Sequence, residues 1–456
     1  MIEDLHVLPV ANRRLIYSPR RGVAAVVSPA AVTSLTAWAE TADGVSPQAI
    51  AGGLAPLVEA LSVPPRMPER APWPPFLGLI VTRDCTMACR YCDFGGKETA
   101  LGPMPPDIAV AAIDGWAEQL HRLGATELNL HFFGGEPFFV PDLVQVAVHR
   151  TRTLAATHGL RTHFEASTNG QLDDATLDFA ADYFDTLVFS VDGMEPDQNR
   201  HRPLANGHGS FQQVHAALKR LRDSPVEICL RCCISAANVG HMAAIAEWFV
   251  DEYRPSVIDF EPMQLFGGCR AGGLELADPG AFAQGFLAAR RKIRAAGVEC
   301  VYSTLHDSSK VGFCPVDQQA YLVAPDGRVR CCYLPAERWQ DLGLDLEIGR
   351  AGADGQFAID PSSLHRVAGL SAEQPVCRTC FCRAGCGGGC LLQDKGPADA
   401  AGYTGVCRHN RLIQAGVLLD DLGQQELADE LLSNPAYREA LLRQPDDRLG
   451  QGTVKT

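Results

Sequence analysis

The chain has 456 residues, 46% of them hydrophobic and 21% charged, as expected for a globular protein with several packed cores. Its formal net charge of −14 argues against nucleic acid as a main partner, because phosphate binding needs clustered Lys and Arg. No apolar run approaches the roughly 18 residues of a membrane span, and the first residues lack the apolar centre of a secretory signal. We therefore expect no membrane partner and a cytoplasmic location.

The first part of the chain has the order of a β-hairpin followed by helices. Two short apolar runs, residues 15–18 and 22–27, flank a Pro-Arg-Arg-Gly turn, which is typical of a hairpin. Helical spacing follows over residues 29–40, where Pro stands at the first helical position, and over residues 47–61. Residues 1–62 are predicted to form a small α+β, winged-helix-like domain.

The next segment is a proline-rich linker that leads into a repeating pattern. Residues 63–75 contain six prolines and are predicted to be stiff and irregular. Over residues 76–298, short apolar runs alternate with amphipathic helical stretches. The six apolar runs begin at residues 76, 127, 162, 186, 227 and 256. This order predicts an α/β fold with a parallel sheet curved into a partial (β/α)6 barrel, whose chemistry lies at the carboxyl ends of the strands.

A group of cysteines follows the first predicted strand directly. Cys85, Cys89 and Cys92 have the spacing C-x3-C-x2-C, and Tyr91 precedes the last of them. Three thiolates on one short loop can hold three irons of a 4Fe–4S cube and leave the fourth iron open to a chelating ligand. The alternative is a zinc site, although zinc usually takes a fourth ligand nearby and paired C-x2-C spacings.

Glycines and polar residues follow the next predicted strands. Glycine permits close backbone approach, and a carboxylate at a strand end offers an acceptor. Each of these residues alone also fits an ordinary turn or helix cap. The candidates for binding a cofactor are Gly134, Gly135, Glu136, Ser167, Asn169, Ser190, Asp192 and Arg202.

Together, the cysteine loop and the stretches FFGGEP, ASTNG, FSVDG and HRP resemble the radical S-adenosylmethionine (SAM) superfamily. The resemblance implies a 4Fe–4S cluster on the cysteine loop that binds the amino and carboxylate groups of SAM. One electron from the cluster cleaves SAM, and a 5′-deoxyadenosyl radical abstracts a substrate hydrogen. It also implies that residues 134–136 receive the methionine ammonium and that Arg202 binds the methionine carboxylate, with Arg200 as the rival. Ser167, Asn169, Ser190 and Asp192 would contact ribose or methionine groups.

A second group of cysteines lies in residues 299–410, where helical and strand periodicity fades and Gly becomes frequent. Such a segment has little apolar surface to bury, so we expect metal to hold it together. It resembles the SPASM domain, which binds two auxiliary 4Fe–4S clusters; two structural zinc ions are the alternative. The resemblance assigns one cluster to Cys314, Cys332 and Cys390, and the other to Cys377, Cys380, Cys386 and Cys407. With the cluster of the first loop, the predicted total is three.

The first auxiliary site departs from the family pattern. Relatives with a fully ligated cluster have another cysteine shortly before the position of Cys314, and here that stretch has none. Cys300 or Cys269 could supply the fourth ligand, or one iron is open. Cys331 and Cys382 lie off the spacing and are expected to be spare. The cysteines of the fifth strand are expected in the core, and residues 411–456 are predicted to form helices and a polar tail.

Four functions are consistent with these motifs. The favoured one is a maturase that installs an oxidative crosslink in a ribosomally made precursor peptide, with a flavodoxin or ferredoxin as electron donor. The alternatives are a sulfatase maturase that makes formylglycine, a small-molecule radical SAM dehydrogenase, and a non-catalytic electron carrier. Sulfatase maturases have an Asp, the expected base, where Tyr333 follows Cys332, and a phenol is a poor base at neutral pH. The N-terminal hairpin also resembles a peptide-recognition domain, whose edge strand could pair with a leader peptide.

Overall fold

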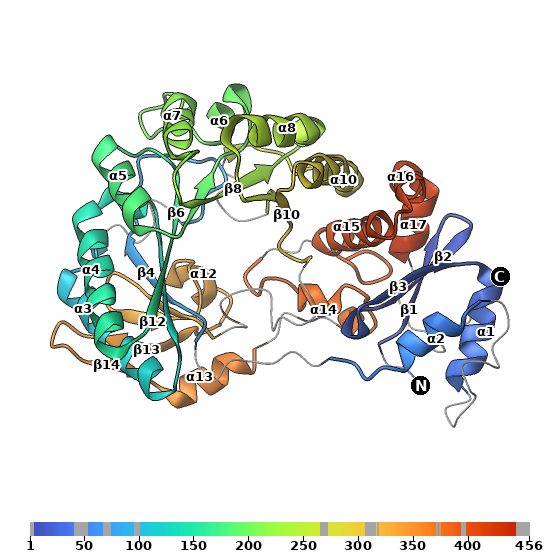
Figure 1. The fold of residues 1–456 in the computed structure, drawn as a ribbon, viewed down its shortest axis with the longest axis horizontal. Helices are drawn as coiled ribbons and strands as arrows, with labels where there is room; N and C mark the ends of the chain where they lie inside the picture. Colours follow the sequence, from blue (N-terminus) through green and yellow to red (C-terminus); the bar gives the residue numbers. More distant parts are fainter. Residues whose placement is uncertain are drawn as a thin grey trace.

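A computed structural model describes most of the chain. The described residues are 4–40, 53–66, 74–94, 101–264, 272–305, 316, 319–370, 373, 375–393 and 398–443. Within these ranges no helix is both long and apolar enough to cross a bilayer. Figure 1 shows a large sheet with its helices at one end of the molecule and a small N-terminal sheet at the other.

The large sheet has eleven strands in the order β10-β9-β8-β7-β6-β5-β4-β11-β12-β13-β14. Their bounds are β4 Leu77–Thr82, β5 Glu127–Gly134, β6 Arg161–Thr168, β7 Thr186–Ser190, β8 Glu227–Ile234, β9 Val257–Pro262, β10 Glu299–Val301, β11 Tyr321–Val323, β12 Arg328–Arg330, β13 Glu347–Ala351 and β14 Phe357–Ile359. Strands β4 to β10 and the β4–β11 pair are parallel, and β11 to β14 form an antiparallel meander. All six predicted strands are present as β4 to β9, so the predicted α/β fold with a parallel sheet is confirmed.

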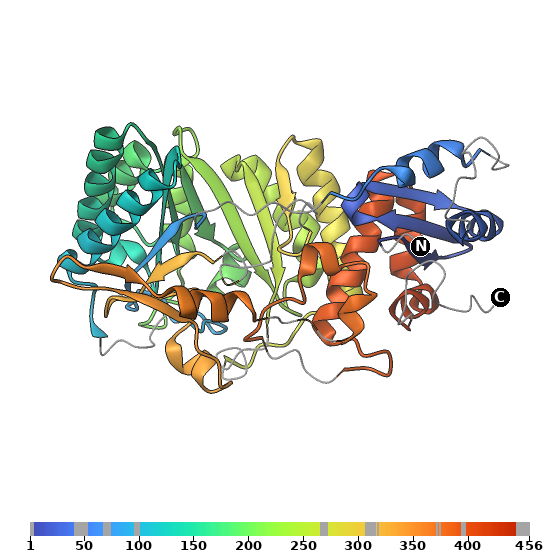
Figure 2. The same cartoon turned by 90° about the horizontal axis from the view of Figure 1, so that it is seen from below.

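Helices follow these strands and cover one face of the sheet (Figure 2). They are α3 Pro106–Arg122, α4 Pro141–His158, α5 Asp174–Tyr183, α6 Glu195–His201, α7 Phe211–Leu221, α8 Met242–Tyr253 and α10 Pro279–Ala295. Burial alternates along the strands: in β5, Leu128, Leu130 and Phe132 are buried against the helices, whereas His131 and Phe133 are partly exposed on the other face. We call this second face the inner face of the sheet.

The N-terminal residues form a three-stranded antiparallel sheet and two helices. The elements are β1 His6–Val10, β2 Arg13–Ser18, β3 Val23–Val27, α1 Pro29–Glu40 and α2 Ala55–Ser62. The predicted hairpin is confirmed as β2 and β3, and the predicted helix over residues 29–40 as α1. Of the second predicted helix, residues 55–61 are helical and residues 47–52 lie outside the described residues. Strand β1 was not predicted because Pro9 interrupts a short run, and it is found where proline is tolerated, at a sheet edge.

The N-terminal sheet lies between two layers of helices. On one face, Ile16 packs with residues of α1 and α2, and on the other, Leu8 and Leu15 join the main core. The helices on that second side include α17, which lies against β1 (Figure 1). They are α15 Gly405–Asp421, α16 Gln425–Ser433 and α17 Pro435–Arg443. The two ends of the chain therefore pack together, and the predicted domain boundaries remain predictions.

The cysteine-rich part has little regular structure beyond the meander β11 to β14. Its helices are α12 Ala336–Gln340, α13 Pro361–Ala368 and α14 Arg383–Cys386. Figure 2 shows this segment running between the large sheet and the C-terminal helices. It thus lies next to the inner face, at the position from which it can close the sheet.

Candidate functional site

The predicted cluster cysteines lie on the loop that leaves β4. All three cysteines are partly buried. The loop is fixed to the segment after α6, because the Ala88 amide donates to the Pro203 carbonyl at 2.8 Å and the Arg90 amide to the His201 carbonyl at 3.0 Å. Burial raises the pKa of Cys89 to about 12, against the opposing charge of Arg202. The free thiol is therefore protonated at neutral pH and deprotonates when it binds metal.

Two of the predicted SAM-binding residues contact this loop. The side-chain amide of Asn169, at the end of β6, donates to Cys85 Sγ at 3.4 Å and to Thr86 Oγ1 at 3.2 Å. Arg202 Nη1 lies 3.9 Å from Cys89 Sγ. Arg200, its predicted rival, is exposed. The geometry therefore favours Arg202 at this site.

The two glycines at the end of β5 permit close packing against the cysteine loop. A Cβ at Gly134 would lie 2.2 Å from the Thr82 carbonyl oxygen, and one at Gly135 would lie 2.2 Å from that of Asp84. With no side chain in the way, the Gly135 amide donates to the Thr82 carbonyl at 2.9 Å. Any larger residue would push β5 away from the loop.

Glu136 is 1% exposed and its carboxylate is occupied by neighbouring donors. Oε1 accepts from the Phe138 amide at 3.1 Å and from Thr168 Oγ1 at 3.0 Å, and Oε2 accepts from the Asn169 amide at 2.7 Å. Burial raises its pKa to about 7 despite these bonds. The side chain thus ties the end of β5 to β6 and orients Asn169. Its predicted contact with a methionine ammonium remains a prediction.

Asp192 is the centre of a buried polar network behind the loop. Its Oδ2 accepts from Tyr91 Oη at 2.6 Å and from Arg202 Nε at 3.0 Å, and its Oδ1 accepts from the Cys233 amide at 2.9 Å. Burial alone would raise its pKa, but Arg202 and His201 outweigh burial and hold the pKa of Asp192 below its ordinary value. The Arg202 guanidinium also lies 5.2 Å from the centre of the Tyr91 ring. Asp192 therefore acts as the brace of Arg202 and Tyr91.

The remaining candidates, Ser167 and Ser190, are partly buried at the ends of β6 and β7. Sequence reasoning did not identify Thr168 and His201 as supports of the site. The sequence pattern included Tyr91, but Asp192, to which its hydroxyl donates, is 101 residues away, and no local pattern connects the two residues.

The predicted second auxiliary site is a small cavity lined by cysteines. Its lining residues are Val376, Cys377, Cys380, Cys382, Arg383, Cys386, Gly388, Tyr403, Cys407, Asn410 and Arg411. All four predicted ligands are among them, and Cys382, which was expected to be spare, is a fifth. Asn410 Nδ2 donates to Cys386 Sγ at 3.2 Å, and Arg411 Nη1 lies 3.6 Å from Cys380 Sγ. Such donors stabilise thiolates that bind a cluster.

The donor set around this cavity fits an iron–sulfur cluster. The cysteines of a 4Fe–4S cube bind different irons, so they surround the space that the cube fills. All four predicted ligands line one cavity. The choice between a cluster and zinc remains a prediction.

The predicted first auxiliary site is described only in part, because Cys314 and Cys269 lie outside the described residues. Burial raises the pKa of Cys332 to about 12, and the nearby thiol of Cys390 adds to the shift. Cys300 lies on the terminal strand β10, and the charges that act on it include those of Arg290 and Asp259. This position gives no support to Cys300 as a ligand beside Cys332.

Arg83 connects the two cysteine groups. It is 1% exposed, stands two residues before Cys85, and donates from Nη2 to the Tyr333 carbonyl at 2.8 Å. Tyr333 in turn follows Cys332, the predicted auxiliary ligand. The loop after β4 and the turn after β12 are therefore joined by one buried side chain.

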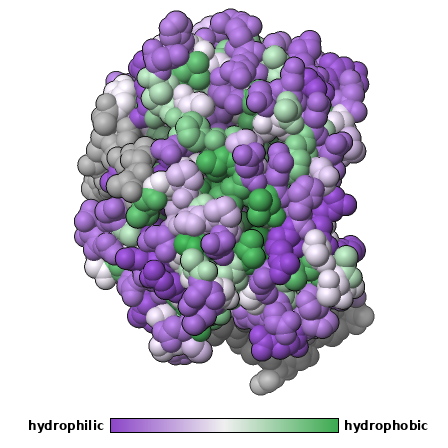
Figure 3. Space-filling view, turned by 90° about the vertical axis from the view of Figure 1, so that its left-hand side faces the viewer, coloured by the Kyte–Doolittle hydropathy of each residue, from purple (hydrophilic) through white to green (hydrophobic). Residues whose placement is uncertain are grey.

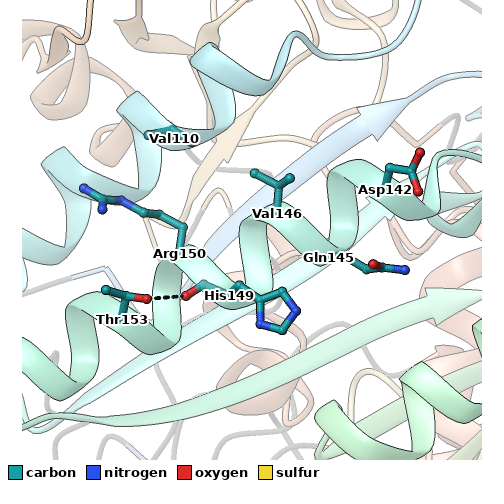
Figure 4. A pocket seen from close by; sticks show the side chains of 7 residues that line it. All are labelled: Val110, Asp142, Gln145, Val146, His149, Arg150 and Thr153. Carbon is teal, nitrogen blue, oxygen red and sulfur yellow. Dashed lines mark hydrogen bonds between the residues drawn. The ribbon is translucent and has the colours of Figure 1, made fainter.

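A surface hollow on the outer side of α3 and α4 lies apart from this site (Figure 4). It is lined by Val110, Asp142, Gln145, Val146, His149, Arg150 and Thr153. Thr153 Oγ1 donates to the His149 carbonyl within the same helix. Figure 3, which views this end of the molecule, shows apolar side chains among mostly hydrophilic ones. None of the lining residues lies at a carboxyl end of a strand.

Comparison with known proteins shows which family and which proteins this chain is similar to. Residues 79–239 match the family model described as the radical SAM superfamily. A serine-type anaerobic sulfatase-maturating enzyme of Klebsiella aerogenes is 24% identical over 345 residues, which are 71% of this chain and 80% of that protein. A PqqA peptide cyclase of Xanthomonas campestris pv. campestris (strain 8004) is 25% identical over 360 residues, covering 74% and 88%.

A solved structure of native anSMEcpe with bound AdoMet and Cp18Cys peptide has the same fold. Its TM-score is 0.58 at 16% identity, and the match covers 76% of this chain and 98% of that one. The matched region of the superfamily runs from within β4 to a few residues beyond β8 and contains the cysteine loop and each of the predicted SAM contacts. Residues 79–239 of this chain are therefore a radical SAM domain.

Proposed function

We propose that the chain is a radical SAM maturase that installs an oxidative crosslink in a ribosomally made precursor peptide. The observation that carries the proposal is the cysteine loop held against Asn169 and Arg202 at the carboxyl edge of the sheet. Two of its relatives are named for modification of a sulfatase and of the peptide PqqA, which supports a peptide or protein as the substrate.

Cys85, Cys89 and Cys92 would hold a 4Fe–4S cluster, which would supply the reductive cleavage of bound SAM. The chain contributes position and charge. Asn169 and the Asp192–Arg202 pair fix the loop from the ends of β6 and β7, and the partly buried site limits the access of water. Further clusters at the two auxiliary sites would bring the total to three. A flavodoxin or ferredoxin is the proposed electron donor.

The N-terminal sheet supports a second contact with the substrate. Among the described residues, no strand pairs with the outer edge of β3, whose five residues are all half-buried, whereas α17 lies against β1. An extended peptide can add to such an edge through main-chain hydrogen bonds. We infer that the leader of the precursor binds along β3. Holding the peptide at this strand raises its effective concentration at the radical source.

Two neighbouring residues of β3 provide a matched test. Along an antiparallel strand, successive amides point to opposite edges, so Ala24→Pro and Ala25→Pro remove one amide toward β2 and one toward the free edge. The variant that loses the amide toward β2 should have a lower melting temperature. The variant that loses the amide toward the free edge should keep the native melting temperature and bind the leader roughly tenfold more weakly. Equal leader affinity in the stable variant and the native enzyme would contradict recognition at this edge.

Formylglycine formation in a sulfatase is the second candidate, and the comparisons support it equally. Tyr333 in place of an Asp argues against it, because burial raises the pKa of this phenol and leaves even less phenolate to act as a base at neutral pH. The test offers two substrates to reconstituted enzyme with SAM and dithionite: a short peptide encoded beside the gene and a sulfatase-derived Ser or Cys peptide. If the short peptide loses hydrogen and gains no carbonyl that reacts with a hydrazide, the result supports the crosslink. A carbonyl in the second would instead establish the sulfatase activity.

A further inference from the structure

The inner face of the sheet carries charged residues that the cysteine loop does not use. Glu165 lies on β6, Arg231 on β8, and Asp259 and Glu261 on β9. Register places Arg231 beside Asp259 and Cys233 beside Glu261, and since side chains alternate along a strand, the three charged groups share the inner face. We call these four residues the inner-face cluster.

Asp259 has a buried oxygen that lacks a donor. Its side chain is 5% exposed, and Oδ2 accepts from Arg231 Nε at 2.8 Å. Oδ1 is fully buried and has no hydrogen-bond partner among the described residues. An unsatisfied buried carboxylate oxygen is costly, and a positive charge bound nearby would reduce that cost. The Arg231 side chain is 51% exposed, so this part of the inner face is accessible from the space above the sheet.

Two aromatic rings lie on the same face. The rings of Phe133 and Tyr333 have centroids 4.3 Å apart. A Cβ at Gly78 would lie 2.5 Å from Leu322 Cδ2 and 3.3 Å from Tyr333 Oη, so the glycine in β4 makes room for both side chains. Phe133 stands two residues after His131 on β5, and register pairs His131 with Glu165, so both rings lie beside the inner-face cluster. Aromatic rings attract cations, most strongly where water is excluded.

The charge balance of the cluster favours a cation. Arg231 offsets one carboxylate, that of Asp259. Burial and the nearby Asp259 raise the pKa of Glu261 to about 8, so this carboxyl is mostly protonated at pH 7. Burial lowers the pKa of His131, the neighbour of Glu165 at 3.7 Å, so the imidazole adds no positive charge there. Glu165 is therefore left as an uncompensated carboxylate.

We propose that the inner-face cluster binds the cationic side chain of a Lys or Arg residue in the peptide segment that is modified. The cation lies against Phe133 and Tyr333, its N–H groups donate to the partly exposed Glu165, and the buried Oδ1 of Asp259 adds negative potential nearby. This inference rests on the proposed function, because it names a residue type of the peptide substrate. It assigns Glu165 as a specificity-determining residue.

Four pools of capped heptapeptides test the proposal, identical except for a central Lys, Arg, norleucine or Glu. Binding to reconstituted enzyme with SAM is measured by fluorescence anisotropy. We expect the Lys and Arg pools to bind roughly tenfold more tightly than the norleucine and Glu pools. Glu165→Gln should reduce this preference to about twofold or less, whereas Arg231→Gln should keep or increase it. The control is Glu247→Gln, which removes a surface carboxylate paired with Lys292 and should change nothing.

The outcomes separate this proposal from the proposed function. Equal binding of all four pools, or preference for the Glu pool, overturns the cationic site and leaves peptide maturation standing. Binding of none of the pools also overturns the cationic site, whereas the proposed function is decided separately by turnover of the precursor that carries its leader. Because SAM is itself a cation, its affinity is measured for each variant by equilibrium dialysis. A loss of SAM affinity in Glu165→Gln equal to the loss of peptide affinity would show that this carboxylate serves SAM, and would also overturn the proposal.

Discussion

The two cysteine groups of this protein are built in opposite ways. The loop after β4 is held by residues that are distant in sequence, since Asn169 and Arg202 contact cysteines 84 and 113 positions away. The cage has two parts: Cys377, Cys380 and Cys386 lie in a segment with one short helix and a 3-10 turn, and Cys407 lies on α15. Much of its bonding is between near neighbours, such as the Cys386 amide and the Cys382 carbonyl.

The difference indicates what each group contributes. The first loop is shaped by the core of the sheet, so its fold should survive without metal, and a cluster there would serve chemistry. In the second group, Phe381 and Cys382 are the buried hydrophobic residues between Cys377 and Cys390, and Phe381 lies against Arg411 of α15. There, metal binding is expected to supply folding free energy. Removing ligands from each group should therefore give different results.

The largest expected effect is on catalysis. Replacing Cys85, Cys89 and Cys92 by Ala should remove about four irons per chain and abolish 5′-deoxyadenosine formation, while the circular dichroism of the sheet persists. Iron analysis, chromatography of the SAM products and thermal unfolding would measure the three quantities. SAM cleavage by this variant under dithionite would show that the radical chemistry is located elsewhere.

The second group should respond in stability as well as in iron content. The native protein is expected to carry about twelve irons, from three cubes of four. Cys407→Ala should lose about four of them and also lower solubility and melting temperature, with SAM cleavage less affected than in the triple variant. Cys229→Ala on β8, outside both groups, is the control and should keep its iron. A protein with about four irons and stoichiometric zinc would contradict the auxiliary clusters.

The sequence predicted the first group better than the second for a physical reason. Strand periodicity together with the C-x3-C-x2-C spacing placed Cys85 at a carboxyl strand end, which the fold confirms. The partners of that loop depend on tertiary packing: the role of Glu136 in holding Asn169, and of Asp192 in holding Arg202, has no signature in local sequence. In the second group, spacing identified four candidate ligands but could not show that Cys382 lines the same cavity, because the chain there follows no regular period.

The brace of the first loop should contribute to stability even without metal. Asp192→Asn leaves Arg202 buried without its counter-charge and should cost about 3 kcal/mol of unfolding free energy in the metal-free protein at pH 7. Because the pKa of folded Asp192 is below its ordinary value, its contribution is present above about pH 4 and is lost as pH falls through the folded pKa. Urea unfolding at pH 7 and at pH 3 should therefore show a smaller difference between native and variant at the lower pH. If the difference in unfolding free energy did not change with pH, the loss of stability would come from packing and not from the charge of Asp192.

The smallest effects expected come from glycines, and they compare the two regions directly. Gly389 has a φ of 79°, and the nearest atom to an added Cβ is Cys386 Sγ at 4.0 Å, so Gly389→Ala meets only backbone strain of about 1 kcal/mol. Gly135→Ala would instead place its Cβ 2.2 Å from the Asp84 carbonyl oxygen, in a region fixed by the core. We expect it to cost about 2 kcal/mol and to displace the loop, since packed strands cannot relax as freely.

In the metal-free protein, Gly135→Ala should lower the free energy of unfolding measurably, whereas Gly389→Ala should hardly change it, because the second region is weakly structured there. With clusters reconstituted, the Gly389 variant should lose a measurable fraction of auxiliary iron. Equal destabilisation of the metal-free protein by both substitutions would mean that the cysteine cage folds without its metal.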